Sequence, residues 1–492
     1  MVVIKMVSKE FNELYQQHEQ KFVKMDQIKR ASKSVLYNNK WKQHNINVSN
    51  LKGISGLRKL PFISADDLRI TWENHPIEEI ILTKNVGMWY CTSGSSGNRK
   101  WMAWTYNDLS RSNEELGKRL LDVIKPDDIM MAILLPSPFI SGSVPYRILE
   151  ATGSIGKPIE QIILSPDTVE DGFGILMKRQ PTIFMCTPSL SLRLAEEIAK
   201  NTPRILKAQA KAQKSTKLRI ASVVTKMIKA KPKQVFKKLR LGYFVSEKLE
   251  PYRKAIEDLY ELEAYDFYGF TEGFGGGFEC EIHNGLHFPS LNGLLEIILD
   301  EELVKEEKDP KYIPEAILLS EVEKGMRGEI VITDFKEAIP LIRYRMRDRI
   351  EVISPDECSC GRNTPRLKIV GRTDAMINIG LIRMPVPIIE DLILKEFKNG
   401  KVNLWEIFIT RDGFKPKLTL AIEPEYVKDE EKFKKELLDS LYSFDLFQRG
   451  IDNELFLFDK IKIVSKLKLE VYGQGKRRKV RYHPDFNKSV KL

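Results

Sequence analysis

The first feature whose residue types could do chemistry is a loop rich in glycine and hydroxyl side chains. It comprises Thr92, Ser93, Gly94, Ser95, Ser96 and Gly97, and it is followed by Asn98, Arg99 and Lys100. Backbone N–H groups and hydroxyls in such a loop can surround phosphate oxygens. The loop is not a Walker A motif, because no Gly-Lys-Ser/Thr follows Gly97. An ordinary polar turn between two strands is the alternative interpretation.

A second polar segment contains Tyr268, Gly269, Phe270, Thr271 and Glu272. A strand that runs into a glycine turn would present a hydroxyl and a carboxylate at the edge of a sheet. Magnesium takes oxygen ligands, usually one or two carboxylates together with phosphate, and Glu272 fits that need. A Tyr-Gly turn with a solvated glutamate is the alternative.

Two charged segments follow further along the chain. Asp348 ends the run Pro340–Asp348, and a carboxylate can accept hydrogen bonds from two hydroxyls of one ligand. Arg372 and Asp374 come next, in the sequence Gly-Arg-Thr-Asp. A surface ion pair is the alternative interpretation of Arg372 and Asp374.

Lys476 lies near the end of the chain, after a glycine on each side of Gln474. A lysine on such a loop could stabilise negative charge that develops during a reaction. The neighbouring Lys and Arg residues allow the alternative that Lys476 is one of several solvated charges.

Cysteine and histidine residues form two clusters that could hold a metal. Cys280 is followed by His283 and His287, and Cys358 and Cys360 form a Cys-Ser-Cys step. Three cysteines and one histidine satisfy a closed tetrahedral zinc site. The five cysteines do not fit a secreted disulfide framework. Reduced thiols without a metal are the alternative.

Taken together and in this order, the segments resemble those of the adenylate-forming superfamily, most closely its phenylacetate–CoA ligase branch. The run Pro340–Asp348, preceded by Gly328 and Glu329, is nearly a signature of that branch. The chain departs from the pattern after Gly97, where Lys-Pro is usual, and at Ala375, where a second Asp is common. The resemblance covers roughly residues 85–480.

The resemblance implies a role for each of these segments in binding ATP. The loop from Thr92 with Lys100 would hold the β- and γ-phosphates, Thr271 would reach the α-phosphate and Glu272 would bind magnesium. Asp348 would hold the ribose hydroxyls, and Arg372 would contact ribose or phosphate. Gly242 and Tyr243 would form the adenine-binding turn, Tyr268 would lie beside the adenine, and Asp266 and Gly269 are further ATP-binding candidates.

The remaining implied roles concern the lid, the acid and the metal. Asp374 would be a hinge, and Lys476 would be the catalytic lysine, acting with Thr271 and Glu272. Phe139 and Tyr146 are candidates for the acid pocket, although a place in the core is the alternative. The spacing in the family favours His287 over His283 as the partner of Cys280, Cys358 and Cys360 in a structural zinc site.

The implied function is an ATP-dependent carboxylic acid–CoA ligase that acts through an acyl-adenylate and releases AMP and pyrophosphate. An aryl acid such as phenylacetate is the expected substrate, with ATP, Mg²⁺ and coenzyme A, and a homodimer is compatible with the family. One alternative is an adenylating synthetase of the deazaflavin-cofactor type, which does not use CoA. Others are a degenerate family member and a non-catalytic, zinc-containing nucleic-acid-binding protein. Against the last alternative, the basic segment of this chain has no aromatic residues interleaved to form a stacking surface.

The length of 492 residues predicts more than one domain. We expect a large ATP- and acid-binding domain at 1–373, helical over 1–85, and a small C-terminal lid domain at 374–492. No apolar run reaches the roughly 18–20 residues that span a bilayer, and no signal peptide is evident, so we expect a cytoplasmic protein.

Alternation of apolar strands and helices predicts an α/β large domain with mixed sheets and helices, and a small mobile ferredoxin-like α+β domain. The expected strands of the large domain are 129–135, 182–186, 239–245 and 263–268, with a second sheet from 293–299, 328–335 and 349–354. In the small domain we expect strands at 382–384, 405–410, 417–422 and 460–464, with helices at 387–398 and 430–442.

A basic segment remains without a role. Between Arg204 and Arg240 there are 13 Lys or Arg and no Asp or Glu, in a chain of net charge +11. A solvated helical surface is one interpretation. Guidance of an anionic substrate, or contact with acidic lipid or nucleic acid, are the others.

Overall fold

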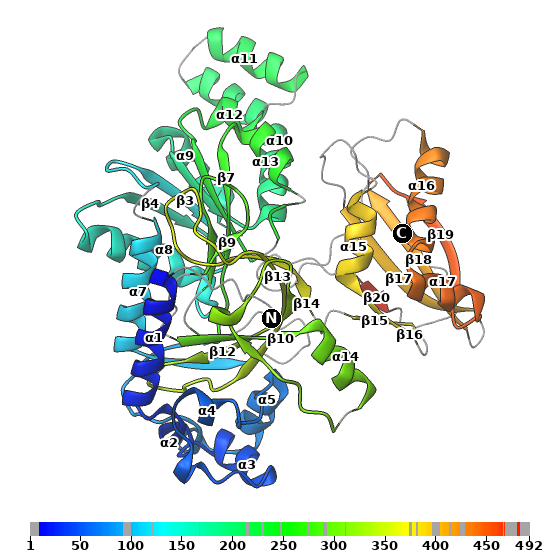
Figure 1. The fold of residues 1–492 in the computed structure, drawn as a ribbon. Helices are drawn as coiled ribbons and strands as arrows, with labels where there is room; N and C mark the ends of the chain where they lie inside the picture. The colour runs from blue at the N-terminus through cyan, green and yellow to red at the C-terminus, as the bar shows by residue number, and fades with distance from the viewer. Residues whose placement is uncertain are drawn as a thin grey trace.

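The computed structural model of the chain shows a large unit built on one long sheet and a smaller unit after residue 376 (Figure 1). It describes residues 9–91, 100–120, 123–166, 168–212, 216–227, 231–246, 248–250, 252–273, 276–288, 293–309, 311–372, 376–379, 382–395, 404–412, 415–423, 429–465, 467 and 480–482. The expected domain boundary at 373 and 374 lies outside these residues.

One half of the long sheet is parallel, as the alternation of strands and helices predicts. It contains β4 (Glu160–Leu164), β3 (Ile129–Ile133), β5 (Ile183–Cys186), β6 (Leu241–Val245) and β7 (Glu263–Tyr268), in that spatial order. All of these strands except β4 were predicted, within a residue or two at each end. Residues of even and odd number in β3 enter different apolar clusters, so both faces of this half are covered.

Helices cover the two faces of the parallel half. Apolar residues of α9 (Val169–Arg179), α10 (Pro188–Ala212) and α13 (Arg253–Tyr260) pack on one face. On the other face the cluster includes Ile148 of α8 (Ile140–Ser154), and α7 (Tyr106–Leu120) lies against α8. The short helix α12 (Pro232–Val235) and α11 (Thr216–Met227) follow α10 in the chain.

The other half of the sheet is antiparallel. It contains β11 (Ile317–Leu318), β10 (Gly293–Leu299), β12 (Arg327–Asp334), β13 (Tyr344–Ser354) and β14 (Arg366–Arg372), and α14 (Asp300–Lys308) follows β10. We expected β10, β12 and the second part of β13 as a separate second sheet, and β11 and β14 were not predicted; the two halves instead form one 12-stranded sheet. The connection runs through β8 (Gly277–Glu279) and β9 (Leu286–His287), which are too short for a periodic pattern to reveal them.

A separate hairpin precedes α7. Its strands β1 (Val86–Cys91) and β2 (Trp101–Thr105) pair with each other and flank the predicted phosphate loop. Strands on both sides of this segment were named only in the alternative interpretation, a polar turn between two strands, and residues 92–99 themselves lie outside the described part.

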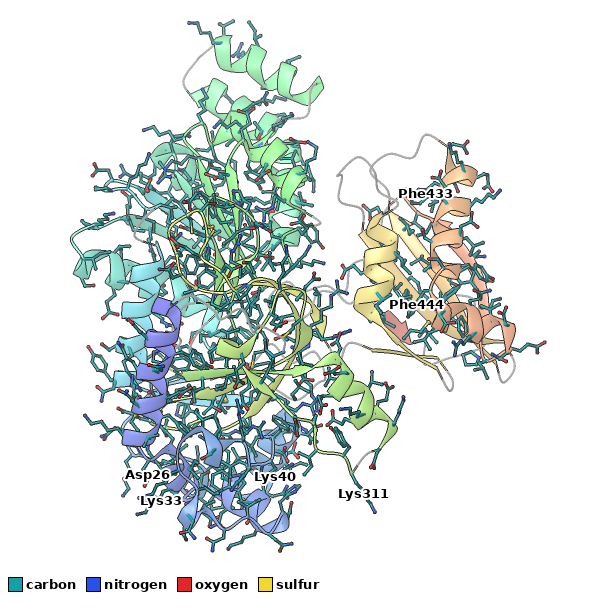
Figure 2. All side chains as sticks on the ribbon, viewed as in Figure 1. Asp26, Lys33, Lys40, Lys311, Phe433 and Phe444 are labelled. Atoms are coloured by element: carbon teal, nitrogen blue, oxygen red, sulfur yellow. The ribbon has the colours of Figure 1, made fainter. Side chains whose placement is uncertain are left out.

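The C-terminal unit is an α+β structure. Its sheet has the order β19 (Leu457–Ile463), β18 (Lys415–Glu423), β17 (Leu404–Asp412) and β20 (Val480–Tyr482), covered by α15 (Val386–Lys395), α16 (Glu430–Tyr442) and α17 (Asp445–Asp452). Phe433 of α16 and Phe444 contribute to this second core (Figure 2). One strand differs from the expected order: β16 (Ile382–Pro385) pairs with β15 (Met376–Ile379), and β20 takes the remaining place in the sheet.

Helices at the N-terminus pack on the antiparallel half and do not form a core of their own. They are α1 (Lys9–Lys24), α2 (Gln27–Ala31), α3 (Val35–Gln43), the 3-10 turn η1 (Val48–Asn50), α4 (Gly53–Leu57), α5 (Ala65–Asn74) and α6 (Ile77–Ile80). The buried apolar residues of α1 to α5 share one cluster with β10, β12 and β13, and Ile80 of α6 lies in another with Ala338 and Ile339.

Two buried tyrosine hydroxyls fix these helices to the sheet. The Tyr15 hydroxyl donates to the Leu295 carbonyl at 2.6 Å and accepts from the Leu295 N–H at 2.9 Å. The Tyr37 hydroxyl donates to the Pro340 carbonyl at 2.8 Å and accepts from the Ile342 N–H at 2.9 Å. Each hydroxyl therefore satisfies two backbone groups that no water reaches.

We predict that Tyr15→Phe and Tyr37→Phe each lower the free energy of unfolding by about 2 kcal/mol, because each leaves two buried backbone groups unpaired. Urea unfolding monitored by tryptophan fluorescence measures this. Tyr106→Phe is the control, since that side chain is 73% exposed. A change at Tyr15 or Tyr37 no larger than at Tyr106 would show that these hydrogen bonds do not hold the helices.

Candidate active site

Glu272 is the centre of a buried hydrogen-bond network just beyond the end of β7. Its Oε1 accepts a hydrogen bond from Lys100 Nζ at 2.6 Å and from the Tyr344 hydroxyl at 3.2 Å. Lys100 Nζ also donates to the Tyr344 hydroxyl at 3.0 Å. Lys100 directly precedes β2, and Tyr344 begins β13. Three segments that are far apart in the sequence thus meet at one carboxylate.

The charge of Glu272 suits a divalent cation. Burial raises the pKa of Glu272, but the charge and hydrogen bond of Lys100 lower it more, so the pKa lies below its ordinary value. The carboxylate is therefore ionised at neutral pH. A single carboxylate in contact with Lys100, which directly follows the predicted phosphate loop, fits Mg²⁺, which takes few protein ligands and completes its shell with phosphate and water oxygens. Thr271, which precedes Glu272, is also buried.

Lys336 contacts the backbone of Glu272, and the sequence analysis did not predict it as a site residue. Its side chain is fully buried and donates a hydrogen bond to the backbone carbonyl of Glu272. Its Nζ lies 3.7 Å from Asp334 Oδ2 and 5.2 Å from the centroid of the Trp104 ring. Burial lowers the pKa of Lys336 and raises that of Asp334 to about 6. Lysine is among the residues least often buried, so no pattern in the sequence predicted this position.

Tyr344 was also missed as a site residue, although a signal for it existed. It lies inside the run Pro340–Asp348 that carries the family resemblance, between two arginines. Its hydroxyl is the second donor to Glu272, and burial raises the pKa of that hydroxyl well above its ordinary value. Tyr344 therefore stays protonated and remains a donor at any physiological pH.

Asp348, Arg372 and Tyr268 form a second group of polar side chains. Asp348 of β13 lies opposite Arg372 of β14 in the sheet register, and Arg372 Nη1 is 3.1 Å from Asp348 Oδ1. The Tyr268 hydroxyl, at the end of β7, donates to Asp348 Oδ2 at 2.7 Å. A carboxylate has two oxygens that accept hydrogen bonds, so Asp348 is a group of the type that can bind ligand hydroxyls. The structure thus brings together three residues that the sequence assigned to the nucleotide.

Of the other predicted ATP-binding residues, Gly242 and Tyr243 lie in the core. Tyr243 is 4% exposed and packs against Tyr265 in the cluster beneath the parallel half. Gly242 leaves no room for a side chain, because a Cβ there would lie 2.6 Å from Phe244 Cε2. Asp266 is half-buried on β7, whereas Gly269 is exposed in the turn that follows. Contact of these residues with ATP stays a prediction.

The two residues proposed for the acid pocket are in different environments. Phe139 is 9% exposed and forms an isolated bridge with Cys91, the last residue before the predicted phosphate loop. Tyr146 of α8 is 61% exposed and does not join this group. Phe139 is therefore the candidate that the geometry keeps near the loop. Thr92–Gly97, Asp374 and Lys476 lie outside the described residues.

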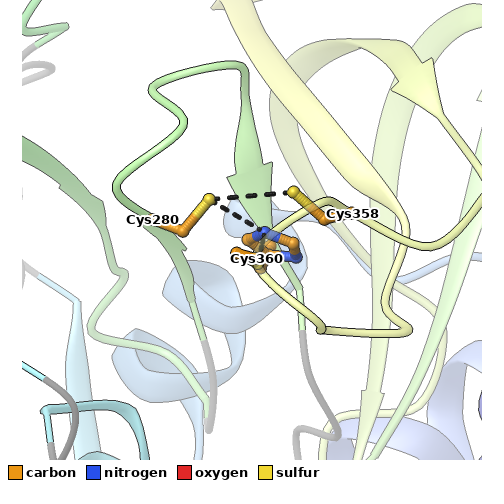
Figure 3. A group of neighbouring side chains, drawn as sticks. Cys280, Cys358 and Cys360 are labelled. Carbon is orange, nitrogen blue, oxygen red and sulfur yellow. Dashed lines mark hydrogen bonds between the residues drawn. The ribbon is translucent and has the colours of Figure 1, made fainter.

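Three cysteines and a histidine converge where the two halves of the sheet meet (Figure 3). Cys280 Sγ lies 3.9 Å from Cys358 Sγ and 3.3 Å from His287 Nε2, and Cys360 Sγ lies 3.5 Å from His287 Nε2. Sulfur ligands at tetrahedral corners around Zn²⁺ would be about 3.8 Å apart. His287 Nδ1 lies 2.9 Å from the Thr364 hydroxyl, which orients the ring. The donor set and its spacing fit a structural zinc ion.

His283 is excluded from this cluster by its own contacts. Its Nε2 lies 3.2 Å from Glu263 Oε1, and its Nδ1 lies 3.1 Å from Glu279 Oε2. Both ring nitrogens therefore face carboxylates. Of the two histidines that follow Cys280, the structure brings only His287 to the three sulfurs.

The cysteine cluster is remote from the polar groups around Asp348. His287 lies opposite Arg366 at the start of β14, while Arg372 ends the same strand. At about 3.3 Å per residue, the two ends of β14 are about 20 Å apart. A metal at the cluster would therefore hold the fold together without contacting the nucleotide site.

Comparison with curated proteins finds relatives over most of the chain. A phenylacetate-coenzyme A ligase of Aromatoleum evansii is 25% identical over 419 residues, which are 81% of this chain and 81% of that protein. Another, from Pseudomonas putida, is 26% identical over 394 residues, 77% of this chain and 74% of that protein. No family model matches the chain.

Comparison with solved structures finds the same fold. A crystal structure of a 2-hydroxyisobutyryl-CoA ligase in complex with 2-HIB-AMP has a TM-score of 0.66 at 18% identity, covering 97% of this chain and 91% of that one. The acyl acid amido synthetase GH3.15 has a TM-score of 0.65 at 14% identity, covering 92% and 86%. The relatives and the similar fold together confirm the family resemblance that the sequence motifs indicate.

Asp266 should make stability depend on pH. Burial, and then the neighbouring charge of Glu279, raise the pKa of Asp266 to about 7. The folded state therefore holds a proton that the unfolded state has lost, and the free energy of unfolding should fall as the pH rises from about 4 to about 7.

We predict that Asp266→Asn removes on the order of 2–4 kcal/mol of this fall, because the amide cannot ionise. Chemical unfolding of both proteins across that pH range measures it. Asp258→Asn, at an exposed position of α13, is the control and should retain the wild-type slope. Parallel pH profiles for wild type and Asp266→Asn would contradict the raised pKa.

Proposed function

We propose that this chain, a relative of the phenylacetate–coenzyme A ligases with the fold of adenylate-forming enzymes, is an ATP-dependent carboxylic acid–CoA ligase. In the first step a carboxylate oxygen attacks the α-phosphorus of ATP, and pyrophosphate leaves. In the second step the CoA thiol loses its proton to solvent, its sulfur attacks the acyl carbon, the bond to AMP breaks, and AMP carries away the electron pair. The protein contributes mainly positioning and charge stabilisation.

The observation that carries this proposal is the meeting of Lys100, Glu272 and Tyr344 beside the group of Asp348, Arg372 and Tyr268. The first group combines a cation with an ionised carboxylate at the exit of a phosphate-binding loop. The second offers a carboxylate, a group that accepts hydrogen bonds from ribose hydroxyls. Such a pair of groups suits a nucleoside triphosphate.

Each residue then has a defined task. Lys100 and the loop from Thr92 to Gly97 would contact the β- and γ-phosphates, and Thr271 the α-phosphate. Glu272 would hold Mg²⁺, which supplies positive charge that neutralises the phosphates. Lys336 would keep the Glu272 backbone in position through its hydrogen bond to the carbonyl.

The lid roles follow from the family resemblance. Residues 1–373 would bind ATP and the acid, and residues 374–492 would form a small domain that turns about Asp374 between the two steps. Lys476 would then bring its ammonium to the acid carboxylate and the α-phosphate during adenylation.

The acid is proposed by chemical class only. Phe139, buried beside the strand that leads into the phosphate loop, would offer an aromatic contact to an aryl acid such as phenylacetate.

We predict that pyrophosphate is released from Mg-ATP only with a suitable aryl acid, and that AMP and thioester accumulate only when CoA is added. Glu272→Gln should lower the rate at least about 100-fold, because the loss of a charged group at the phosphates removes electrostatic stabilisation. Glu301→Gln, at an exposed position of α14, is the control. A coupled pyrophosphate assay over a panel of acids, with and without CoA, measures both.

Two outcomes would redirect the proposal. Acid-dependent release that is indifferent to CoA, with no thioester formed, would indicate adenylation for another acceptor. Release that Glu272→Gln leaves unchanged would remove Glu272 from the site.

We also propose that Cys280, His287, Cys358 and Cys360 hold a structural zinc ion. The ion would tie the connection between β8 and β9 to the loop between β13 and β14. β8 and β9 have only three and two residues, so a crosslink beside them would be expected to stabilise the join.

We predict about one zinc per chain by elemental analysis, and His287→Gln should weaken zinc binding more than about 100-fold and lower the melting temperature. His283→Gln is a matched control, because that ring faces two glutamates and no cysteine. Equal zinc loss in both variants, or no zinc in wild-type protein supplied with the metal, would refute the site.

A further inference from the structure

The basic segment that the proposed function does not use forms a helical projection. After α10 the chain turns back into α11, and the two helices pack against each other. Figure 1 shows α11 at one end of the molecule, beyond α12 and far from the N-terminal helices α2 to α5. We call α10, α11 and the residues up to Arg240 the basic hairpin.

The charged residues of the basic hairpin from Arg204 to Arg240 are all positive. This stretch contains 13 Lys or Arg and no Asp or Glu. Of the residues whose exposure is described, Lys207, Lys211, Lys217, Arg219, Lys231, Lys237 and Lys238 are exposed. Such a surface attracts anionic partners of any kind, so charge alone does not identify the partner.

Two exposed aliphatic side chains on α11 indicate which anionic partner fits this surface. Ile220 is 61% exposed and Val223 is 59% exposed, so both leave apolar surface in contact with solvent. They lie one helical turn apart and so form a single stripe. At 3.6 residues per turn, Lys217 and Arg219 fall on opposite sides of that stripe. An apolar stripe flanked by cations is the pattern of a helix that lies in a membrane interface.

Two rival partners fit the surface less well. Nucleic acid bases stack on exposed aromatic rings, but the only aromatic residue between 188 and 240 is Phe236, and it is buried. A second copy of the chain would bring two surfaces of the same strong positive charge together. An anionic bilayer accepts both the cations and the aliphatic stripe.

We propose that the basic hairpin docks on an anionic lipid bilayer. Ile220 and Val223 enter the boundary between headgroups and acyl chains, and Lys217, Arg219 and the neighbouring lysines contact lipid phosphates. No helix in the described part of the chain is long and apolar enough to cross a membrane, so the contact is peripheral. This inference does not depend on the proposed ligase activity.

The test uses the full-length protein and its co-sedimentation with vesicles. Vesicles of phosphatidylcholine alone should bind little protein, and vesicles that also contain phosphatidylglycerol should bind it. Lys217→Gln with Arg219→Gln should weaken that binding roughly 30-fold, because each basic residue near an anionic surface contributes about fivefold. Lys432→Gln with Lys435→Gln on α16 makes the same change in net charge at exposed positions and should alter binding less than about threefold.

A second pair of variants tests the apolar stripe. Part of the wild-type binding should survive high salt, because salt screens the charges but not the burial of aliphatic groups. Ile220→Ser with Val223→Ser should lose that part. Ile70→Ser with Ile175→Ser, at side chains that are 50% and 46% exposed elsewhere, should keep it. Melting temperatures of all variants check that they fold.

Three results would overturn the proposal. Equal loss in the α16 variant would show that net charge alone draws the protein to vesicles. If the wild-type protein binds no vesicles but binds a single-stranded RNA oligonucleotide, and the Lys217→Gln with Arg219→Gln variant does not bind the RNA, the surface would be assigned to nucleic acid. A dimer in sedimentation velocity that Ile220→Ser with Val223→Ser abolishes, again without vesicle binding, would assign it to a second copy.

Discussion

The join between the two halves of the long sheet is the constraint on which the rest of the structure depends. Within the described residues, the long sheet joins its parallel half to its antiparallel half through β8 and β9, which have three and two residues. So few ladder hydrogen bonds hold two large halves weakly by themselves. The polar groups around Glu272 and Asp348 draw on both halves, and the cysteine cluster joins this connection to the antiparallel half. Both groups of side chains therefore depend on one narrow connection.

Buried charge at this join is arranged so that each ion has a partner. Glu272 has Lys100, Asp348 has Arg372, and Lys336 has both Asp334 and the Glu272 carbonyl. Removing one member of such a pair leaves the other desolvated and unpaired, which is costly. The same arrangement leaves Glu272 ionised in spite of its burial. The residues buried at this join are therefore also the ones whose charges stabilise each other.

The parts of the fold and of the candidate site that depend on residues close together in the sequence were predictable from the sequence. The bounds of β10 and α16 follow from apolar spacing, and the cysteine cluster follows from ligand chemistry together with the family spacing. The single sheet was not predictable, because strands of two or three residues carry no period. Lys336 was missed because its burial depends on partners distant in sequence. Lys476 and the phosphate loop stay predictions, since they lie outside the described residues.

The tyrosine contacts of the N-terminal helices have a consequence for how the chain folds during synthesis. Tyr15 and Tyr37 bond to backbone groups 280 to 305 residues further along the chain. At 5–20 residues per second, a ribosome would need roughly 15–60 s to supply those partners. Over that interval the apolar face of the first helices has no native surface to cover it. Molecular chaperones that bind nascent chains would thus find their longest-lived target at the very beginning of this protein.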